Sequence, residues 1–136
     1  MTDHSAMPQP PAPTSAQPSA ASRQSAVLDR WFDQGPGPSR PLLVIAGPCV
    51  LEDDATNLRI GETVAAICAD LKLPYVFKAS FDKANRSSIK SPRGPGLKRG
   101  LDMIAAMRER LGVPATTDIH EPHQAEAAGK AVDLIQ

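Results

Sequence analysis

The sequence predicts an α/β fold in which crossover helices connect the strands of a parallel sheet. Short apolar runs of strand length recur along residues 42–136, and stretches with the apolar spacing of amphipathic helices separate them. Gly and Pro residues mark most of the boundaries between these segments. Strand and helix therefore alternate from a first strand to a fourth, which is typical of parallel strands joined by helices.

The chain ahead of this region is predicted to contribute little to the core. Residues 1–25 contain no Val, Ile, Leu or aromatic residue, so we expect a disordered Pro/Ala/Ser-rich tail. The tail does not resemble a signal peptide, because it lacks a basic start followed by an apolar core. Residues 26–41 are predicted to form a covering segment, with a short helix near Val27–Phe32, and a Gly- and Pro-rich linker.

The first strand and helix are predicted from an apolar run and a periodic segment. Residues 42–46 are apolar throughout and precede Gly47, which is typical of a strand buried on both faces. Acidic residues at positions 52–54 favour a helix start. Apolar residues then recur at a helical spacing and predict one packed face: Ile60, Val64, Ile67 and Leu71.

The remaining elements follow in the same order. A second strand is predicted from Pro74 to about Lys78, and the loop that follows, residues 82–95, is longer than the roughly 2–6 residues usual before a helix. Long loops of this kind often carry function. The remaining predicted elements are a helix at 97–111 ended by Gly112, a strand at 113–119, a helix from Glu121-Pro122 to Gly129, and a strand at 132–136.

Two parallel-sheet architectures fit this order, a doubly wound sheet and part of a (β/α)8 barrel. The first strand is not followed by Gly-x-Gly-x-x-Gly, which weakens the dinucleotide-binding alternative. The sequence also lacks the Gly-x-x-x-x-Gly-Lys-Ser/Thr phosphate loop.

Composition narrows the function classes. The formal net charge is zero, so the whole chain has no electrostatic bias toward nucleic acid or membranes. No apolar run approaches the roughly 20 residues of a membrane-spanning helix, and we expect a soluble, cytoplasmic protein. Residues 78–99 nevertheless hold seven Lys or Arg and one Asp, which predicts an anionic ligand. Two cysteines give no disulfide framework.

Polar residues follow all four predicted strands at their carboxyl ends. Cys49 follows the first strand, residues 78–87 follow the second, Asp118 and His120 follow the third, and Gln136 closes the fourth. In barrels and open parallel sheets alike, active sites form at this edge. The sequence therefore predicts a site there.

Alternatives remain open for individual residues. Cys49 is either a small packed residue or a thiolate that binds a metal. Lys78, within a buried strand, needs an anion or a partner. Lys83 and Arg86 either bind an anion or are solvated loop charges.

Asp118 is either a site residue or the cap of the next helix, and His120 either makes a structural hydrogen bond or contacts a ligand. His4 and His123 are expected at the surface. The basic run is expected to be a solvated face or a subunit contact: Lys90, Arg93, Lys98 and Arg99.

With these motifs in hand, residues 42–136 resemble 3-deoxy-D-manno-octulosonate 8-phosphate synthase. The segments that carry the resemblance are Phe77–Ser88, Arg93–Leu97 and Thr117–Pro122. Ala46–Cys49 is less specific, because it also resembles the synthase that makes 3-deoxy-arabino-heptulosonate 7-phosphate. That relative usually has a Lys-Pro-Arg-Thr motif where this chain has Lys83–Ser87.

The resemblance implies a (β/α)8 TIM barrel, of which this chain covers about the first four strands and three helices. It implies condensation of phosphoenolpyruvate with arabinose 5-phosphate for lipopolysaccharide biosynthesis, in a homotetramer. The implied catalytic residues are Lys78, Lys83 and Asp118. The implied substrate-binding residues are Ser80, Asn85, Arg86, Ser87, His120 and Gln136.

By the same resemblance, Cys49 would place the protein in the metal-dependent class, with iron, zinc or manganese as the divalent ion. The family's remaining ligands, a His, a Glu and an Asp, come from the later half of the barrel. The synthase that makes the seven-carbon product is the first alternative. A non-catalytic anion-binding or assembly fragment is the second, whereas nucleic-acid binding is weak because no aromatic residues alternate with the cations.

Overall fold

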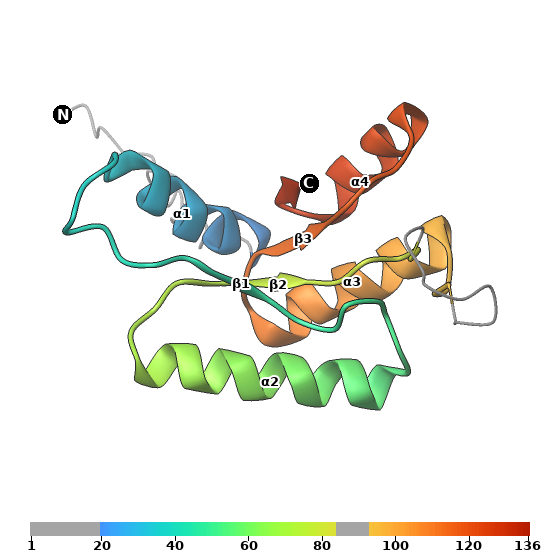
Figure 1. The fold of residues 1–136 in the computed structure, drawn as a ribbon, viewed down its shortest axis with the longest axis horizontal. Helices are drawn as coiled ribbons and strands as arrows, with labels where there is room; N and C mark the ends of the chain where they lie inside the picture. The colour runs from blue at the N-terminus through green and yellow to red at the C-terminus, as the bar shows by residue number, and fades with distance from the viewer. Residues whose placement is uncertain (1–19, 84–92) are drawn as a thin grey trace, which may run out of the picture.

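The computed structural model describes residues 20–83 and 93–136. Within these ranges the strands form one sheet in the order β1-β2-β3-β4, and every neighbouring pair is parallel. Helices connect the strands (Figure 1). The prediction of four parallel strands that alternate with helices is confirmed.

The strands are shorter than the apolar runs that predicted them. They are β1 (Val44–Ala46), β2 (Tyr75–Lys78), β3 (Ala115–Thr117) and β4 (Leu134–Ile135). The expectation that the first strand is buried on both faces is wrong in this structure. β1 pairs only with β2 among the described strands, and Ile45 at its centre is 48% exposed.

The predicted helix boundaries are confirmed at several ends. α2 (Asp54–Asp70) begins after Asp53, whose carboxylate accepts the Thr56 N–H at 2.9 Å. α3 (Leu97–Leu111) ends at Gly112, which has a φ of 65° in the left-handed region. Before β4 the chain forms a short 3-10 helix, η1 (Pro122–Gln124), followed by α4 (Ala125–Ala131). Gly129 does not end this helix, because two further residues continue it.

The predicted packed face of α2 is wrong for its second half. Ile67 and Leu71 are 52% and 62% exposed, whereas the buried residues are Asn57, Gly61 and Cys68. A Cβ at Gly61 would lie 2.6 Å from a Leu111 methyl group, so α3 approaches α2 closely at this position. The contact with α3 therefore selects a different stripe of α2 from the one with the most apolar residues.

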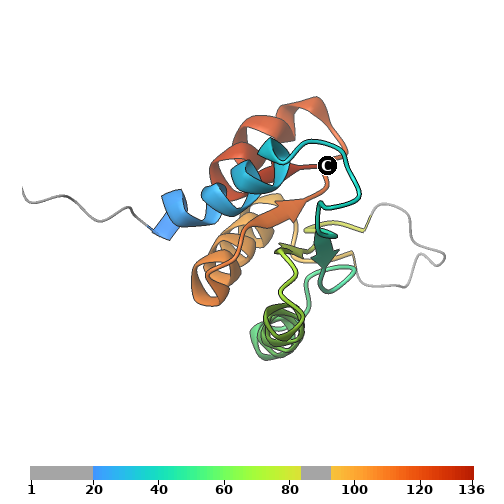
Figure 2. The same ribbon diagram turned by 90° about the vertical axis from the view of Figure 1, so that its left-hand side faces the viewer.

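The core lies between the sheet and its helices. Alternate residues of β2 and of the segment just after it are almost fully buried: Phe77, Ala79 and Phe81. They share one core cluster with Leu101 and Ile104 of α3. α2 contacts α3, and α3 contacts α4, so these helices follow one another around the outside of the strands (Figures 1 and 2). This arrangement is the one expected of part of a (β/α)8 barrel.

The first helix, α1 (Ala20–Asp33), extends further toward the N-terminus than the predicted short helix. Its residues Val27 and Trp31 line a cavity together with Leu73 and Pro74, which lead into β2. α1 therefore lies near the amino ends of the strands, away from the edge where the predicted site lies. The division of the chain into tail, covering segment and barrel half stays a prediction.

None of the helices described here combines the length and the apolar character that crossing a lipid bilayer requires.

Candidate functional site

The loops after β1 and β2 lie side by side at the carboxyl edge of the sheet. Val50 forms a parallel bridge with Ser80, and the Leu51 N–H donates to the Ser80 carbonyl at 3.0 Å. Gly47 permits this approach, because a Cβ there would lie 2.1 Å from the Lys78 carbonyl oxygen. Cys49, in the same loop, is exposed, which does not agree with the alternative of a small packed residue.

Lys78, Ser80 and Asp118 form a compact polar cluster at this edge. The Lys78 Nζ lies 3.2 Å from Ser80 Oγ and 3.4 Å from Asp118 Oδ1. The Ser80 hydroxyl donates a hydrogen bond to the same Asp118 oxygen. The Lys78 and Asp118 side chains remain about a quarter exposed, so the cluster is open to solvent and to a ligand.

The surroundings of Asp118 keep its carboxylate ionised. Partial burial alone raises the pKa of Asp118, but the hydrogen bond from Ser80 and the positive charge of Lys78 outweigh it. The net effect is a pKa below the ordinary value of 3.8. At neutral pH the cluster therefore presents an ammonium, a hydroxyl and a carboxylate.

The structure does not support the alternative of Asp118 as a helix cap. The 3-10 helix η1 is capped by Glu121 in a capping box with Gln124. Asp118 is instead engaged with Lys78 and Ser80.

His120 connects this cluster to the loop after β2. Its Nε2 lies 3.5 Å from Asp118 Oδ2 and 3.0 Å from the Asp82 carbonyl oxygen. The backbone N–H of His120 donates to Gln124 Oε1 at 2.9 Å, which fixes the turn into η1. His120 thus makes structural hydrogen bonds and also lies beside the Lys78–Ser80–Asp118 cluster.

Lys83 is the last described residue of the loop that follows β2 at the carboxyl edge of the sheet. Its backbone N–H donates to the Arg93 carbonyl at 2.7 Å. The Arg93 guanidinium binds both carboxylate oxygens of Asp82, with Nε to Oδ1 at 2.9 Å and Nη2 to Oδ2 at 2.6 Å. Sequence reasoning missed this pair, although Asp82 is the single acidic residue among the seven cations of residues 78–99.

The remaining predicted residues are placed in part. Gln136 extends the ladder beyond β4, because its N–H donates to the Thr117 carbonyl and its carbonyl accepts the Ile119 N–H. Its side chain is exposed. Asn85, Arg86 and Ser87 lie outside the described residues, as does Lys90 of the basic run.

Metal-binding side chains do not gather in the described part of the chain. Within residues 20–83 and 93–136, no group of three or more His, Cys, Asp or Glu could hold a metal ion. Cys49 is thus a single candidate donor here and not a complete site.

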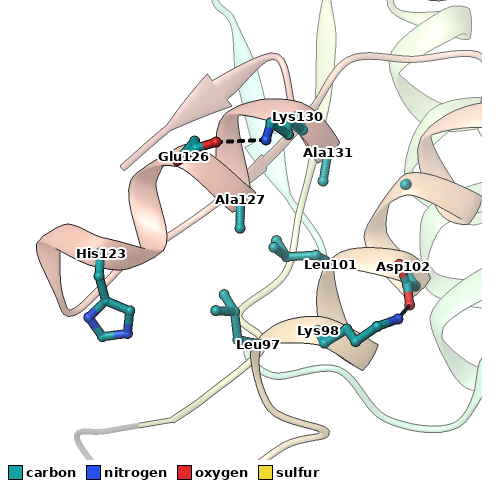
Figure 3. Close-up of a pocket in the computed structure, with 10 residues that line it drawn as sticks. Leu97, Lys98, Leu101, Asp102, His123, Glu126, Ala127, Lys130 and Ala131 are labelled. Carbon is teal, nitrogen blue, oxygen red and sulfur yellow. Dashed lines mark hydrogen bonds and ion pairs between the residues drawn. The ribbon is translucent and has the colours of Figure 1, made fainter.

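A groove lies elsewhere, between α3 and α4 (Figure 3). It encloses about 580 Å³. Leu97 and Leu101 face Ala127 and Ala131 across it, and the ion pairs Lys98–Asp102 and Glu126–Lys130 lie along its borders. His123, predicted at the surface, is exposed and lines one end. None of the predicted site residues lines this groove.

Comparison with known proteins identifies the family to which the chain is similar. Residues 20–136 match the model described as the DAHP synthetase I family. Three similar proteins are each called 2-dehydro-3-deoxyphosphooctonate aldolase. The protein of Geotalea daltonii is 50% identical over 100 residues, that of Desulfotalea psychrophila 53% over 100, and that of Koribacter versatilis 48% over 95.

The matched region covers most of this chain and a smaller share of its relatives. The three alignments include 74%, 74% and 70% of the chain, in the same order. They include 37%, 36% and 34% of the relatives. The chain thus spans little more than a third of the length of these curated relatives.

Proposed function

Because the chain belongs to the DAHP synthetase I family, we propose that the protein containing it condenses phosphoenolpyruvate with D-arabinose 5-phosphate. The products are inorganic phosphate and 3-deoxy-D-manno-octulosonate 8-phosphate, and the latter serves lipopolysaccharide biosynthesis. The name shared by the similar proteins of Geotalea and Desulfotalea supports this choice of substrates.

The observation that carries the proposal is the Lys78–Ser80–Asp118 cluster at the carboxyl edge of the sheet. A reaction that joins two phosphorylated substrates needs fixed cations, because the like-charged ligands repel each other at close range. It also needs polar groups that orient the sugar. The cluster supplies an ammonium, a hydroxyl and an ionised carboxylate within hydrogen-bond reach of one another.

In the proposed reaction, carbon three of the enol attacks the aldehyde carbon of the sugar and forms the new C–C bond. The aldehyde oxygen takes up a proton. Water adds at carbon two, and phosphate then leaves with cleavage of its C–O bond. Lys78 and Lys83 stabilise the negative charge of phosphoenolpyruvate and of the developing oxyanion. Ser80, Asp118 and His120 orient the sugar.

The remaining substrate contacts are carried over from the family pattern. Asn85, Arg86 and Ser87 hold the sugar hydroxyls and the sugar phosphate, and Gln136 lies near phosphoenolpyruvate. We further propose that the protein is cytoplasmic and that it assembles as a homotetramer. Light scattering on the purified protein would test the homotetramer.

Cys49 is proposed as one ligand of a divalent ion, which would be iron, zinc or manganese. Its exposure next to Val50, the residue that bridges to Ser80, supports this role, and a thiolate prefers such ions over magnesium. The described residues provide no complete site, so the other ligands have to come from elsewhere in the protein. When bound, the ion would help to orient the sugar aldehyde or water.

Chelation tests the metal assignment. We expect the protein expressed from its complete gene to lose activity in chelator and to regain it with added divalent ion. The Cys49→Ser variant should bind the ion more weakly in a direct metal assay. Full activity in chelator with no metal added would contradict the assignment.

The overall function is tested by phosphate release from phosphoenolpyruvate in the protein expressed from its complete gene. Release should require arabinose 5-phosphate, and Lys78→Ala should lower kcat/KM by at least about a hundredfold. Lys98→Ala, which removes an exposed lysine of α3, is the matched control and should change kcat/KM by less than about twofold.

Two outcomes of this assay identify the alternatives. Preference for a four-carbon aldose phosphate would indicate the synthase of the seven-carbon product, because the enol adds three carbons. Binding of phosphoenolpyruvate without release of phosphate would indicate a non-catalytic anion-binding protein.

A further inference from the structure

The two ends of the long loop after β2 are joined by several interactions outside the Lys78–Ser80–Asp118 cluster. Arg93 binds the Asp82 carboxylate through two hydrogen bonds, and its own carbonyl accepts the Lys83 N–H at 2.7 Å. Just beyond, the Gly96 N–H donates to the Phe81 carbonyl at 3.0 Å. Residues 81–83 and 93–96 thus run alongside each other.

This junction is closely packed against the core. Gly94 has a φ of 104°, and a Cβ there would lie 2.6 Å from the Phe81 carbonyl oxygen. A Cβ at Gly100 would lie 2.3 Å from the Phe81 Cβ. Phe81 is only 1% exposed, so the junction is anchored in the core.

The junction also contacts the predicted site. The Asp82 carbonyl lies 3.0 Å from His120 Nε2, and the same nitrogen lies 3.5 Å from Asp118. A continuous series of contacts therefore leads from Arg93 through Asp82 and His120 to Asp118. The Arg93 side chain is 59% exposed, so its charge is directed to Asp82 and solvent rather than to the core.

We propose that Asp82 and Arg93 are positioning residues that fix the backbone of Lys83 at the edge of the site. The proposal rests on the proposed function, which gives Lys83 its role with phosphoenolpyruvate. A two-point Arg–carboxylate pair is suited to this task, because its planar geometry defines direction as well as distance. Small displacements of a substrate-binding group have large effects on rate.

The test compares three variants of the protein expressed from its complete gene. Asp82→Asn removes the charge of the pair. The double variant Asp82→Arg/Arg93→Asp restores an ion pair with its partners exchanged. Asp102→Asn is the matched control, because it removes the carboxylate of the exposed Lys98–Asp102 pair, whose atoms are 3.2 Å apart.

We expect Asp82→Asn to raise KM for phosphoenolpyruvate by about tenfold, with a smaller change in kcat, because the variant displaces the Lys83 backbone and keeps the Lys83 side chain. In the double variant, the logarithm of KM should return at least halfway to the wild-type value. The KM of Asp102→Asn should stay within about twofold of the wild type. Hydrogen exchange at the Lys83 amide should become about tenfold faster in Asp82→Asn and slow again in the exchanged pair.

Two results would overturn the proposal. The first is unchanged KM and unchanged exchange in Asp82→Asn. The second is a loss of activity in Asp82→Asn that the double variant does not recover, while hydrogen exchange at the Lys83 amide stays as in the wild type. Asp82 would then act on the substrate directly. If the wild-type protein released no phosphate, the proposed function would fail, whereas exchange at Lys83 would still decide the positioning role.

Discussion

At the scale of single residues, the cluster at the carboxyl edge depends on how Asp118 is held. Two neighbours, Lys78 and Ser80, contact the same carboxylate oxygen, Oδ1. Both favour the ionised form and together outweigh the effect of burial, so the pKa of Asp118 is lowered. A group whose pKa is lower in the folded protein adds stability above its unfolded pKa, and this contribution disappears as the pH falls through the folded pKa.

Ser80→Ala therefore has a defined effect on stability. Losing the hydroxyl should raise the pKa of Asp118 and lower the free energy of unfolding by about 1.5 kcal/mol at pH 7. The difference from the wild type should shrink as the pH falls below the ordinary carboxyl value of 3.8. Urea unfolding of the protein expressed from its complete gene, measured from pH 7 to pH 3, would show this trend.

The exposed Ser39 provides the control. Ser39→Ala should leave unfolding unchanged across this range. A difference between wild type and Ser80→Ala that stayed constant with pH would argue against the hydrogen bond to the ionised carboxylate.

At the scale of secondary-structure elements, one ion pair connects α3 to the amino ends of two strands. The side chain of Asp133 is 4% exposed and binds Arg108 through both carboxylate oxygens, at 2.6 Å and 2.5 Å. Its Oδ2 also accepts the Ala115 N–H at 3.0 Å. A single carboxylate thus holds α3, β3 and the start of β4 together.

We expect Asp133→Asn to destabilise the protein by about 3 kcal/mol, because it leaves the partly buried Arg108 without this carboxylate. The measurement is chemical unfolding of the protein expressed from its complete gene. Asp102→Asn, on the exposed face of the same helix, should cost less than about 0.5 kcal/mol. Equal effects of the two substitutions would contradict the assigned role.

The elements show what sequence could and could not predict. The start of α2 and the end of α3 were predictable, because an Asp cap and a left-handed Gly are local signals. The packed face of α2 was not, because close packing against Leu111 selects Gly61 over the larger Ile67. Contacts of this kind depend on neighbours far along the chain.

The same limit applies to the site. The rule that active-site residues gather at the carboxyl ends of parallel strands predicts that Lys78 and Asp118 lie near each other, as they do. The pairing of Asp82 with Arg93 could not be predicted, because four cations lie closer to Asp82 in sequence than Arg93 does: Lys78, Lys83, Arg86 and Lys90. Only the fold decides which of them reaches the carboxylate.

At the scale of the whole molecule, the described sheet has two outer strands. β1 and β4 each pair with one neighbour among the described strands. Ile45 at the centre of β1 is 48% exposed, and Ile135 of β4 is 39% exposed. Unpaired strands with exposed apolar side chains recruit other strands.

A polypeptide of these 136 residues, expressed alone, should therefore self-associate and show no synthase activity. Light scattering should show a smaller assembly for Ile45→Lys, since a lysine on an outer strand discourages pairing. Ile67→Lys is the control, because Ile67 is 52% exposed but lies on a helix. An equal effect of both variants would attribute association to apolar area in general, and a monomeric wild-type polypeptide would refute the expectation.

Trp31 is an intrinsic fluorescence probe of its surroundings. It is the single tryptophan of the chain, its indole N–H donates to the Pro41 carbonyl at 2.9 Å, and the Arg40 guanidinium lies 3.3 Å from the ring centroid. Emission from such a ring is sensitive to whether the linker stays folded over α1. Because α1 lies near the amino ends of the strands, this signal reports the docking of that helix separately from events at the opposite edge, where a ligand would bind.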